Sequence, residues 1–189
     1  MDIAFHCVTK KMHAGSGLQS QTGNIASMPI RHAAPSDLPA IVSIYNAAIP
    51  GRMATADVEP VSVAEREEWF GAFDSKRRPL WVYEHEGAII GWLGLRSYYG
   101  RPAYHRTVES AVYVDPEHRR RGIAHDLLAH ALVEAPALGI ANVLAFVFVH
   151  NQPSVTLFEA HGFQRWGLLP RICELDGVER DVLVLGRRL

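Results

Sequence analysis

The chain has 189 residues, of which 48% are hydrophobic and 21% are charged, and its formal net charge at pH 7 is -1. These values predict one globular domain with a full core and exclude a wholly disordered chain. The near-neutral charge argues against broad adhesion to nucleic acid, and no apolar run reaches the roughly 18 residues of a membrane-spanning helix. Two cysteines, Cys7 and Cys173, are too few for a disulfide framework, so we expect a reducing, cytoplasmic environment.

The first part of the chain differs in composition from the rest. Residues 1–28 are rich in Gly, Ser, Gln and Thr without sustained periodicity, which predicts an irregular or disordered tail. Residues 29–189 contain no repeat and no linker, so we expect one domain there. Hydrophobic periodicity, caps and turn signals predict the order β-α-α-β-β-β-α-β-α-β-β, at residues 30–33, 38–49, 62–73, 80–85, 88–95, 107–114, 120–138, 142–149, 151–161, 165–173 and 178–186.

One stretch carries the strongest functional signal. A strand at 107–114 stops at Asp115-Pro116, and a helical apolar pattern begins at Ile123 after a basic, glycine-containing loop. The first turn of a helix has backbone N–H groups without intrahelical partners, and these attract anions. Gly122 leaves room for a phosphate, and three preceding arginines add positive charge. The loop therefore suits a pyrophosphate, although a solvated arginine face or a nucleic-acid patch is the alternative.

These segments resemble the GCN5-related N-acetyltransferase (GNAT) superfamily. The spacing Arg119-x-x-Gly122-x-Ala124 after a Val-Tyr-Val strand is similar to its acetyl-CoA signature. The segment Asn151-x-x-Ser154-x-x-x-Phe158-Glu159-x-x-Gly162-Phe163 is similar to a second motif of the family, and the predicted element order is that of the GNAT fold. The resemblance covers roughly residues 29–189. It implies an α/β (α+β) domain with a mixed, mostly antiparallel central sheet that is flanked by helices and splayed between its two central strands.

The resemblance also implies acetyl-CoA as the co-substrate, without a metal. It places the pantetheine arm and an oxyanion-stabilising N–H along the strand that ends at Val114, and the pyrophosphate at the basic loop. The implied cofactor-binding residues are Val112, Tyr113, Val114, Arg119, Arg120, Arg121, Gly122, Ile123, Ala124, Asn151, Ser154 and Phe158. Asn151 can equally be a plain helix N-cap.

Within the superfamily the chain resembles the phosphinothricin N-acetyltransferase branch. The matching segments are Thr107–Val114, Ile44–Ile49 and the loop Arg101-Pro102-Ala103-Tyr104. Members of this branch acetylate the amino group of small amino-acid analogues such as phosphinothricin and methionine sulfoximine or sulfone, and commonly form homodimers. We therefore expect a cytoplasmic, homodimeric N-acetyltransferase that binds a small amine and acetyl-CoA, without nucleic acid or membrane as partners.

Acetyl transfer to an amine needs a proton acceptor, because an ammonium group has no lone pair with which to attack. Glu109 is the predicted base; by alternation it shares a strand face with Ala111 and Tyr113. The alternative is that Glu109 merely pairs with an arginine. The family often has Tyr or His where this chain has Phe158, so the thiolate leaves unaided or a neighbour such as Tyr113 or His150 protonates it.

The predicted substrate-binding residues are Arg101, Tyr104, Thr107 and Glu109. The guanidinium fork of Arg101 can hold a carboxylate through two parallel hydrogen bonds. Tyr99 stands where phosphinothricin enzymes tend to have a lysine, which weakens that particular substrate assignment. A peptide N-terminus or a polyamine as substrate, and a non-catalytic module that binds coenzyme A or nucleic acid, are the alternatives.

Overall fold

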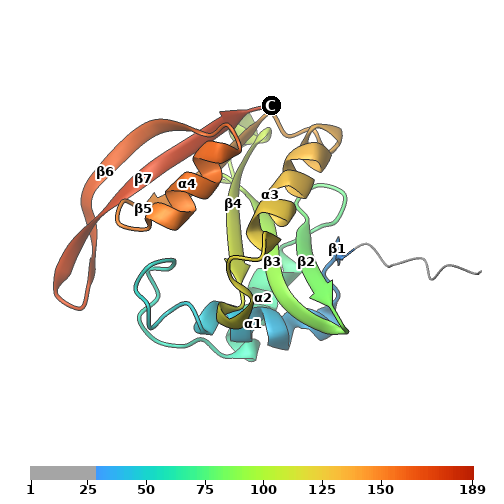
Figure 1. The fold of residues 1–189 in the computed structure, drawn as a ribbon. Coiled ribbons are helices and arrows are strands. Elements are labelled where there is room, and N and C mark those ends of the chain that lie inside the picture. The colour runs from blue at the N-terminus through green and yellow to red at the C-terminus, as the bar shows by residue number, and fades with distance from the viewer. Residues whose placement is uncertain (1–28) are drawn as a thin grey trace, which may run out of the picture.

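The computed structural model describes residues 29–189 (Figure 1). The predicted tail at residues 1–28 lies outside the described residues. The helices and strands follow one another in the predicted order. They are β1 (Ile30–His32), α1 (Leu38–Asn46), α2 (Val63–Gly71), β2 (Leu80–His85), β3 (Ala88–Ser97), β4 (Thr107–Val114), α3 (Ile123–Glu134), β5 (Asn142–Phe148), α4 (Gln152–Ala160), β6 (Gln164–Leu175) and β7 (Val178–Arg188).

The strands form one sheet in the order β1-β2-β3-β4-β5-β7-β6. Neighbouring strands are antiparallel except β4 and β5, which are parallel, so the sheet is mixed and mostly antiparallel as predicted. The hairpins β2–β3 and β6–β7 turn at Glu86-Gly87 and Asp176-Gly177, where both residues have positive φ angles. Such two-residue turns match the twist of the strands that they join. The β6–β7 hairpin extends beyond the rest of the sheet (Figure 1).

The helices cover the sheet from both sides. On one side, α3 and α4 pack over β3, β4 and β5 around fully buried residues such as Leu93, Val108 and Leu127. On the other side, α1 packs over Trp92 and Val82 with the aromatic residues of α2 at its edge. Because side chains alternate between the two faces of a strand, β3 contributes to both cores and is buried from Ile90 to Leu95.

The helices end somewhat earlier than predicted, and the helix predicted at residues 120–138 differs at both ends. The helix predicted to begin at Arg120 begins at Ile123, because Arg120 (φ 61°) and Gly122 (φ 85°) adopt left-handed conformations that an α-helix cannot contain. The same helix ends at Glu134, and a short 3-10 helix (Ala135–Leu138) that contains Pro136 follows. The missing N–H of proline explains the change of helix type.

The pairing between the two central strands is interrupted. β4 and β5 are paired only from Thr107 to Glu109 and from Asn142 to Leu144. At the last paired position the Ser110 hydroxyl donates a hydrogen bond of 3.0 Å to the Leu144 carbonyl, so this buried carbonyl is satisfied where the ladder ends. Beyond this point the strands diverge, which is the predicted splay. Within residues 29–189, no helix has both the length and the apolar character that a membrane crossing requires.

An ion pair fixes the entrance to α1. The Asp37 carboxylate, which is almost completely buried, accepts two hydrogen bonds from the Arg31 guanidinium (2.7 and 3.0 Å) and one from the Ala34 N–H (2.7 Å). The hydrogen bonds from Arg31 lower the pKa of Asp37 below its ordinary value of 3.8. A carboxyl group whose pKa is lower in the folded state stabilises the fold above its unfolded pKa and loses that contribution as the pH falls.

We therefore expect Asp37→Asn to lower the free energy of unfolding by about 1–3 kcal/mol at neutral pH, because buried donors lose a charged acceptor. The difference from the parent protein should shrink as the pH falls below the ordinary aspartate pKa. Urea unfolding at neutral pH and at a pH below the ordinary aspartate pKa measures this difference. Glu84→Gln removes the more exposed partner of Arg31 and is the control, for which we expect a smaller loss of stability. A difference that does not depend on pH would contradict the ion-pair explanation.

Candidate active site

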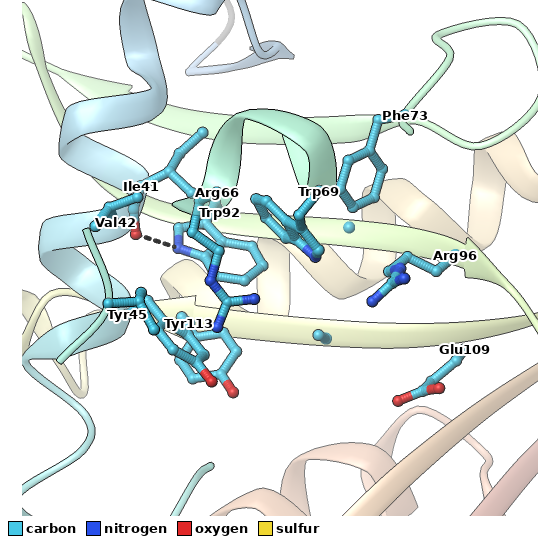
Figure 2. A pocket seen from close by; sticks show the side chains of 13 residues that line it. Ile41, Val42, Tyr45, Arg66, Trp69, Phe73, Trp92, Arg96, Glu109 and Tyr113 are labelled. Carbon is cyan, nitrogen blue, oxygen red and sulfur yellow. Dashed lines mark hydrogen bonds between the residues drawn. The ribbon is translucent and has the colours of Figure 1, made fainter. Parts of the chain in front are cut away.

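Three cross-strand pairs on β3 and β4 build a hollow on the sheet face below α1 and α2. In order, the pairs are Trp92 with Tyr113, Gly94 with Ala111, and Arg96 with Glu109. Alternate residues of a strand share a face, so all three pairs point to the same side. The middle pair is small and forms a floor, while the outer pairs rise as an aromatic wall and a charged wall. The result is a cavity of about 210 Å³, which we call the aromatic cavity (Figure 2).

The aromatic wall is rigidly held. The rings of Trp92 and Tyr113 stack with centroids 4.7 Å apart, and Trp69 of α2 meets Trp92 edge-on at 5.6 Å. The indole N–H of Trp92 donates to the Ile41 carbonyl at 3.2 Å, which ties the wall to α1 (Figure 2). Gly94 lets the Phe73 ring lie close to the strand, because a Cβ atom at position 94 would be only 2.9 Å from that ring. These contacts hold the aromatic wall against α1 and α2.

The charged wall consists of Glu109 and Arg96. Water reaches the Glu109 side chain from the open side of the cavity, but the surrounding walls remove part of its hydration. Burial therefore raises the pKa of the Glu109 carboxyl above its ordinary value, and the positive charge of Arg96 opposes the rise. A carboxylate with a raised pKa is a better proton acceptor than an ordinary glutamate.

Glu109 also lines a second cavity, which occupies the splay between β4 and β5. This gap cavity has a volume of about 300 Å³ and lies between residues 109–113 of β4 and residues 145–148 of β5. The buried ring of Phe158 from α4 closes part of it. Because Glu109 lines both cavities, its carboxyl group stands where the hollow on the sheet face meets the opening between the strands.

A third cavity, of about 530 Å³, lies at the start of α3, and we call it the helix-end cavity. Among the described residues, the backbone N–H groups of residues 119–125 have no hydrogen-bond acceptor. Gly122 takes a φ angle of 85°, which favours glycine, so the chain can turn these groups into the cavity. This arrangement is a ready site for a phosphate-bearing ligand.

Most of the residues predicted to bind the cofactor meet at the helix-end cavity. It is lined by Val112, Tyr113, Val114, Arg119, Arg120, Gly122, Ile123, Ala124, Asn151 and Ser154. The predicted residue Arg121 does not line it, and Phe158 lines the gap cavity instead. The Asn151 side chain caps α4 by accepting from the Ser154 N–H at 3.2 Å, so the N-cap role that the sequence left open is observed.

A segment between the helices predicted at residues 38–49 and 62–73 covers part of the site. Residues 52–57, which we call the strap, offer three consecutive carbonyl groups to side chains of the site. His150 Nε2 lies 2.9 Å from the Arg52 carbonyl, Asn151 Nδ2 donates to the Met53 carbonyl at 2.7 Å, and the Tyr113 hydroxyl donates to the Ala54 carbonyl at 2.9 Å. Because a carbonyl only accepts, His150 carries its proton on Nε2.

The predicted substrate clamp lies elsewhere. Arg101 and Tyr104 belong to an exposed loop around the short 3-10 helix Pro102–Tyr104, where Tyr104 packs against Tyr98 and Tyr99. The Thr107 hydroxyl accepts a hydrogen bond of 3.2 Å from the Asn142 side chain. None of Arg101, Tyr104 and Thr107 lines the aromatic, gap or helix-end cavity. Of the predicted substrate residues, the structure places Glu109 alone in these cavities.

Comparison of the sequence with models of known protein families identifies the family of this chain. Residues 39–163 match the model of the family described as "Acetyltransferase (GNAT) family". The chain belongs to this family. The acetyltransferase is 48% identical over 163 residues to YwnH of Bacillus subtilis, a protein named as a candidate phosphinothricin acetyltransferase, with 86% of this chain and 99% of that protein covered.

Two further relatives place the acetyltransferase in the phosphinothricin-acetyltransferase-like branch. An L-methionine sulfoximine/L-methionine sulfone acetyltransferase of Pseudomonas paraeruginosa is 31% identical, with 80% of this chain and 88% of that protein covered. The crystal structure of a phosphinothricin acetyltransferase of Sinorhizobium meliloti in complex with acetyl-CoA superposes with a TM-score of 0.80 at 30% identity, and covers 85% of this chain and 87% of that one. The GNAT fold and the acetyltransferase activity that the sequence predicted are thus confirmed. Residues 29–189 contain no group of three or more metal-ligating side chains.

The sequence suggests Tyr113 as a proton donor to the thiolate, but in the acetyltransferase its hydroxyl proton is used in another hydrogen bond. Its hydroxyl holds the strap through the Ala54 carbonyl. Burial, and next the neighbouring Tyr45, raise the pKa of Tyr113 and make it a weaker acid.

We expect Tyr113→Phe to lower the free energy of unfolding by about 1 kcal/mol through the lost hydrogen bond. Turnover should stay within about tenfold of the parent enzyme, because loss of a true proton donor typically removes about 10²–10⁴-fold. Urea unfolding and steady-state rates of the same preparation measure both effects. A fall in kcat beyond about a hundredfold with unchanged stability would instead identify Tyr113 as the general acid.

Proposed function

We propose that the protein transfers the acetyl group of acetyl-CoA to the amino group of small amino-acid-like substrates, of the phosphinothricin, methionine sulfoximine or methionine sulfone type. The observation that carries the proposal is the position of Glu109 at the junction of the aromatic cavity and the gap cavity. The names of the relatives support the same substrate class. A cavity of about 210 Å³ with a closed floor favours a small amine over a peptide.

The helix-end cavity is the proposed site of the coenzyme. Its free backbone N–H groups and the side chains of Arg119 and Arg120 suit the pyrophosphate. Residues of β4 beyond Glu109 have no strand partner on the β5 side, so their backbone groups are available to the amides of the pantetheine arm. The arm can then continue through the gap cavity and bring the thioester close to Glu109. Phe158 would line this path in the gap cavity, and Arg121 would act at its periphery.

Glu109 is the proposed general base. Acetyl-CoA, when bound, supplies the acetyl group and a thiolate leaving group. The Glu109 carboxylate accepts a proton from the substrate ammonium group, directly or through a water molecule, which frees the nitrogen lone pair. The amine nitrogen then bonds to the acetyl carbon as the carbon–sulfur bond breaks, and the second proton that the nitrogen loses passes to the departing thiolate or to water. Because the Tyr113 hydroxyl is bound to the strap, we propose that the thiolate leaves without a protein acid.

We further propose that the enzyme is a cytoplasmic homodimer. β6 is an edge strand with one free side, and it exposes Trp166 (47%), Leu168 (53%) and Ile172 (58%). An exposed apolar edge strand favours association with another chain. The branch to which the protein belongs supports a second copy as that chain. Arg101 and Tyr104 lie outside the three cavities of the single chain. Their predicted contact with the substrate in the homodimer stays a prediction.

The decisive assay follows release of free thiol from acetyl-CoA in the presence of phosphinothricin, methionine sulfoximine or methionine sulfone. We expect Glu109→Gln to lower kcat by about 10²–10⁴-fold near neutral pH, with the affinity for acetyl-CoA unchanged. Because the pKa of Glu109 is raised, the acid limb of the parent enzyme should lie above the ordinary glutamate value of 4.5. That limb should be absent from the variant.

Glu67→Gln, which removes an exposed carboxylate on α2, is the matched control. Two results would reject the proposal. One is a parent enzyme that releases no thiol with any small amine tested. The other is a Glu109→Gln enzyme that retains the acid limb and the turnover of the parent.

A further inference from the structure

Three arginines are candidates to hold an anionic group of the substrate. Arg66 lines the aromatic cavity, but its guanidinium is already paired with the Asp57 carboxylate at 2.8 Å and lies over the Tyr45 ring at 4.7 Å. Arg101 lies outside the cavity. Arg96 lines the cavity, and within residues 29–189 its guanidinium makes no hydrogen bond or ion pair. The available positive charge of the cavity is therefore that of Arg96.

Arg96 and Glu109 are cross-strand neighbours of opposite charge that do not form an ion pair. They are directly opposite in the β3–β4 register, where opposite charges normally attract. Nevertheless the two groups are not within ion-pair distance. Figure 2 shows the guanidinium and the carboxylate extending from neighbouring strands into the same open space, without a contact between them. A cation and an anion that face one cavity and do not neutralise each other are complementary to a ligand that carries both charges.

We propose that Arg96 binds the α-carboxylate of the substrate while Glu109 receives its α-amino group, so that the enzyme selects free α-amino acids. This inference rests on the proposed acetyl transfer. In an α-amino acid the ammonium and carboxylate groups sit on one carbon, so their separation is short and fixed. A guanidinium can hold the carboxylate through two parallel hydrogen bonds, which orients the amine toward Glu109.

The rest of the cavity then determines the side chain. With both charged groups at the Arg96–Glu109 wall, the side chain of the substrate extends over Gly94 and Ala111 toward the stacked rings of Trp92 and Tyr113. This floor has no charge, so an apolar or weakly polar chain of moderate length fits. The Arg66–Asp57 pair lies at the far side, where a sulfone or phosphinate oxygen could accept a hydrogen bond from the remaining N–H groups of Arg66.

Two substrates separate this role from a general structural one. Arg96→Ala should raise KM for methionine sulfone by about 10–100-fold, the range expected for lost hydrogen bonds to a charged group. At a pH above the acid limb it should leave kcat/KM for the corresponding amine without the carboxylate within about threefold, since less than 1 kcal/mol is then lost. Arg96→Lys should recover part of the loss. Arg77→Ala, an exposed arginine before β2 that lines none of the three cavities, is the matched control.

The pH profile supplies a second readout. Arg96 opposes the rise in the pKa of Glu109, so Arg96→Ala should move the acid limb of activity on the amine to higher pH. The other titratable or charged groups that line the cavity are Tyr45 from α1, Arg66 from α2 and Tyr113 from β4, and the variant leaves them unchanged.

Calorimetric binding of methionine sulfone to Glu109→Gln, with and without Arg96→Ala, tests the carboxylate site without turnover. Loss of binding on removal of Arg96 supports the site even if acetyl transfer fails, which distinguishes this inference from the proposed function. Equal losses for methionine sulfone and for the amine without a carboxylate would overturn the inference. So would a selective loss in Arg101→Ala together with an unaffected Arg96→Ala.

Discussion

The interruption of hydrogen bonding between β4 and β5 is the constraint on which the active site depends. The ladder stops after Glu109, and the Ser110 hydroxyl donates to the carbonyl of Leu144, the last β5 residue that is paired with β4. The separation makes room for the gap cavity between the two strands. It also leaves the backbone of β4 free on one side, beside the free N–H groups at the start of α3. One interruption thus creates both the gap cavity, through which we propose that the thioester reaches Glu109, and the free strand edge proposed for the pantetheine arm.

The second constraint is the size of two side chains on the floor of the aromatic cavity. Gly94 and Ala111 oppose each other between a pair of stacked aromatic rings and a pair of opposite charges. Any larger residue at position 94 would come too close to the Phe73 ring, which would have to move. The three pairs lie in a row on one face of the sheet. The depth of the cavity, its aromatic wall and its charged wall therefore all follow from the β3–β4 register. The strap then covers the site by binding side chains from β4 and from the start of α4.

The features that the sequence predicted depend on residues close together in the chain. The Glu86-Gly87 turn, the Asn151 cap and the anion-seeking loop before α3 are each determined by local conformational preference, and the motifs around Gly122 and Phe158 indicated the family. The missed features depend on contacts between distant residues. The position of Arg96 opposite Glu109 is set by the register of two strands, which the sequence does not reveal. The hydrogen bond from Tyr113 to Ala54 joins segments that are far apart in sequence. For the same reason the sequence suggested Arg101 as the clamp but gave no sign of Arg96.

The most direct test of the account is a crystal structure of the protein with a bisubstrate compound, in which the sulfur of coenzyme A is joined through an acetyl linker to the amine of methionine sulfone. The account predicts that the pyrophosphate meets the backbone N–H groups of residues 119–125 and that the linker crosses the gap between β4 and β5 beside the Glu109 carboxyl. A linker that bypasses this gap, or a gap that is closed when the compound is bound, would contradict it.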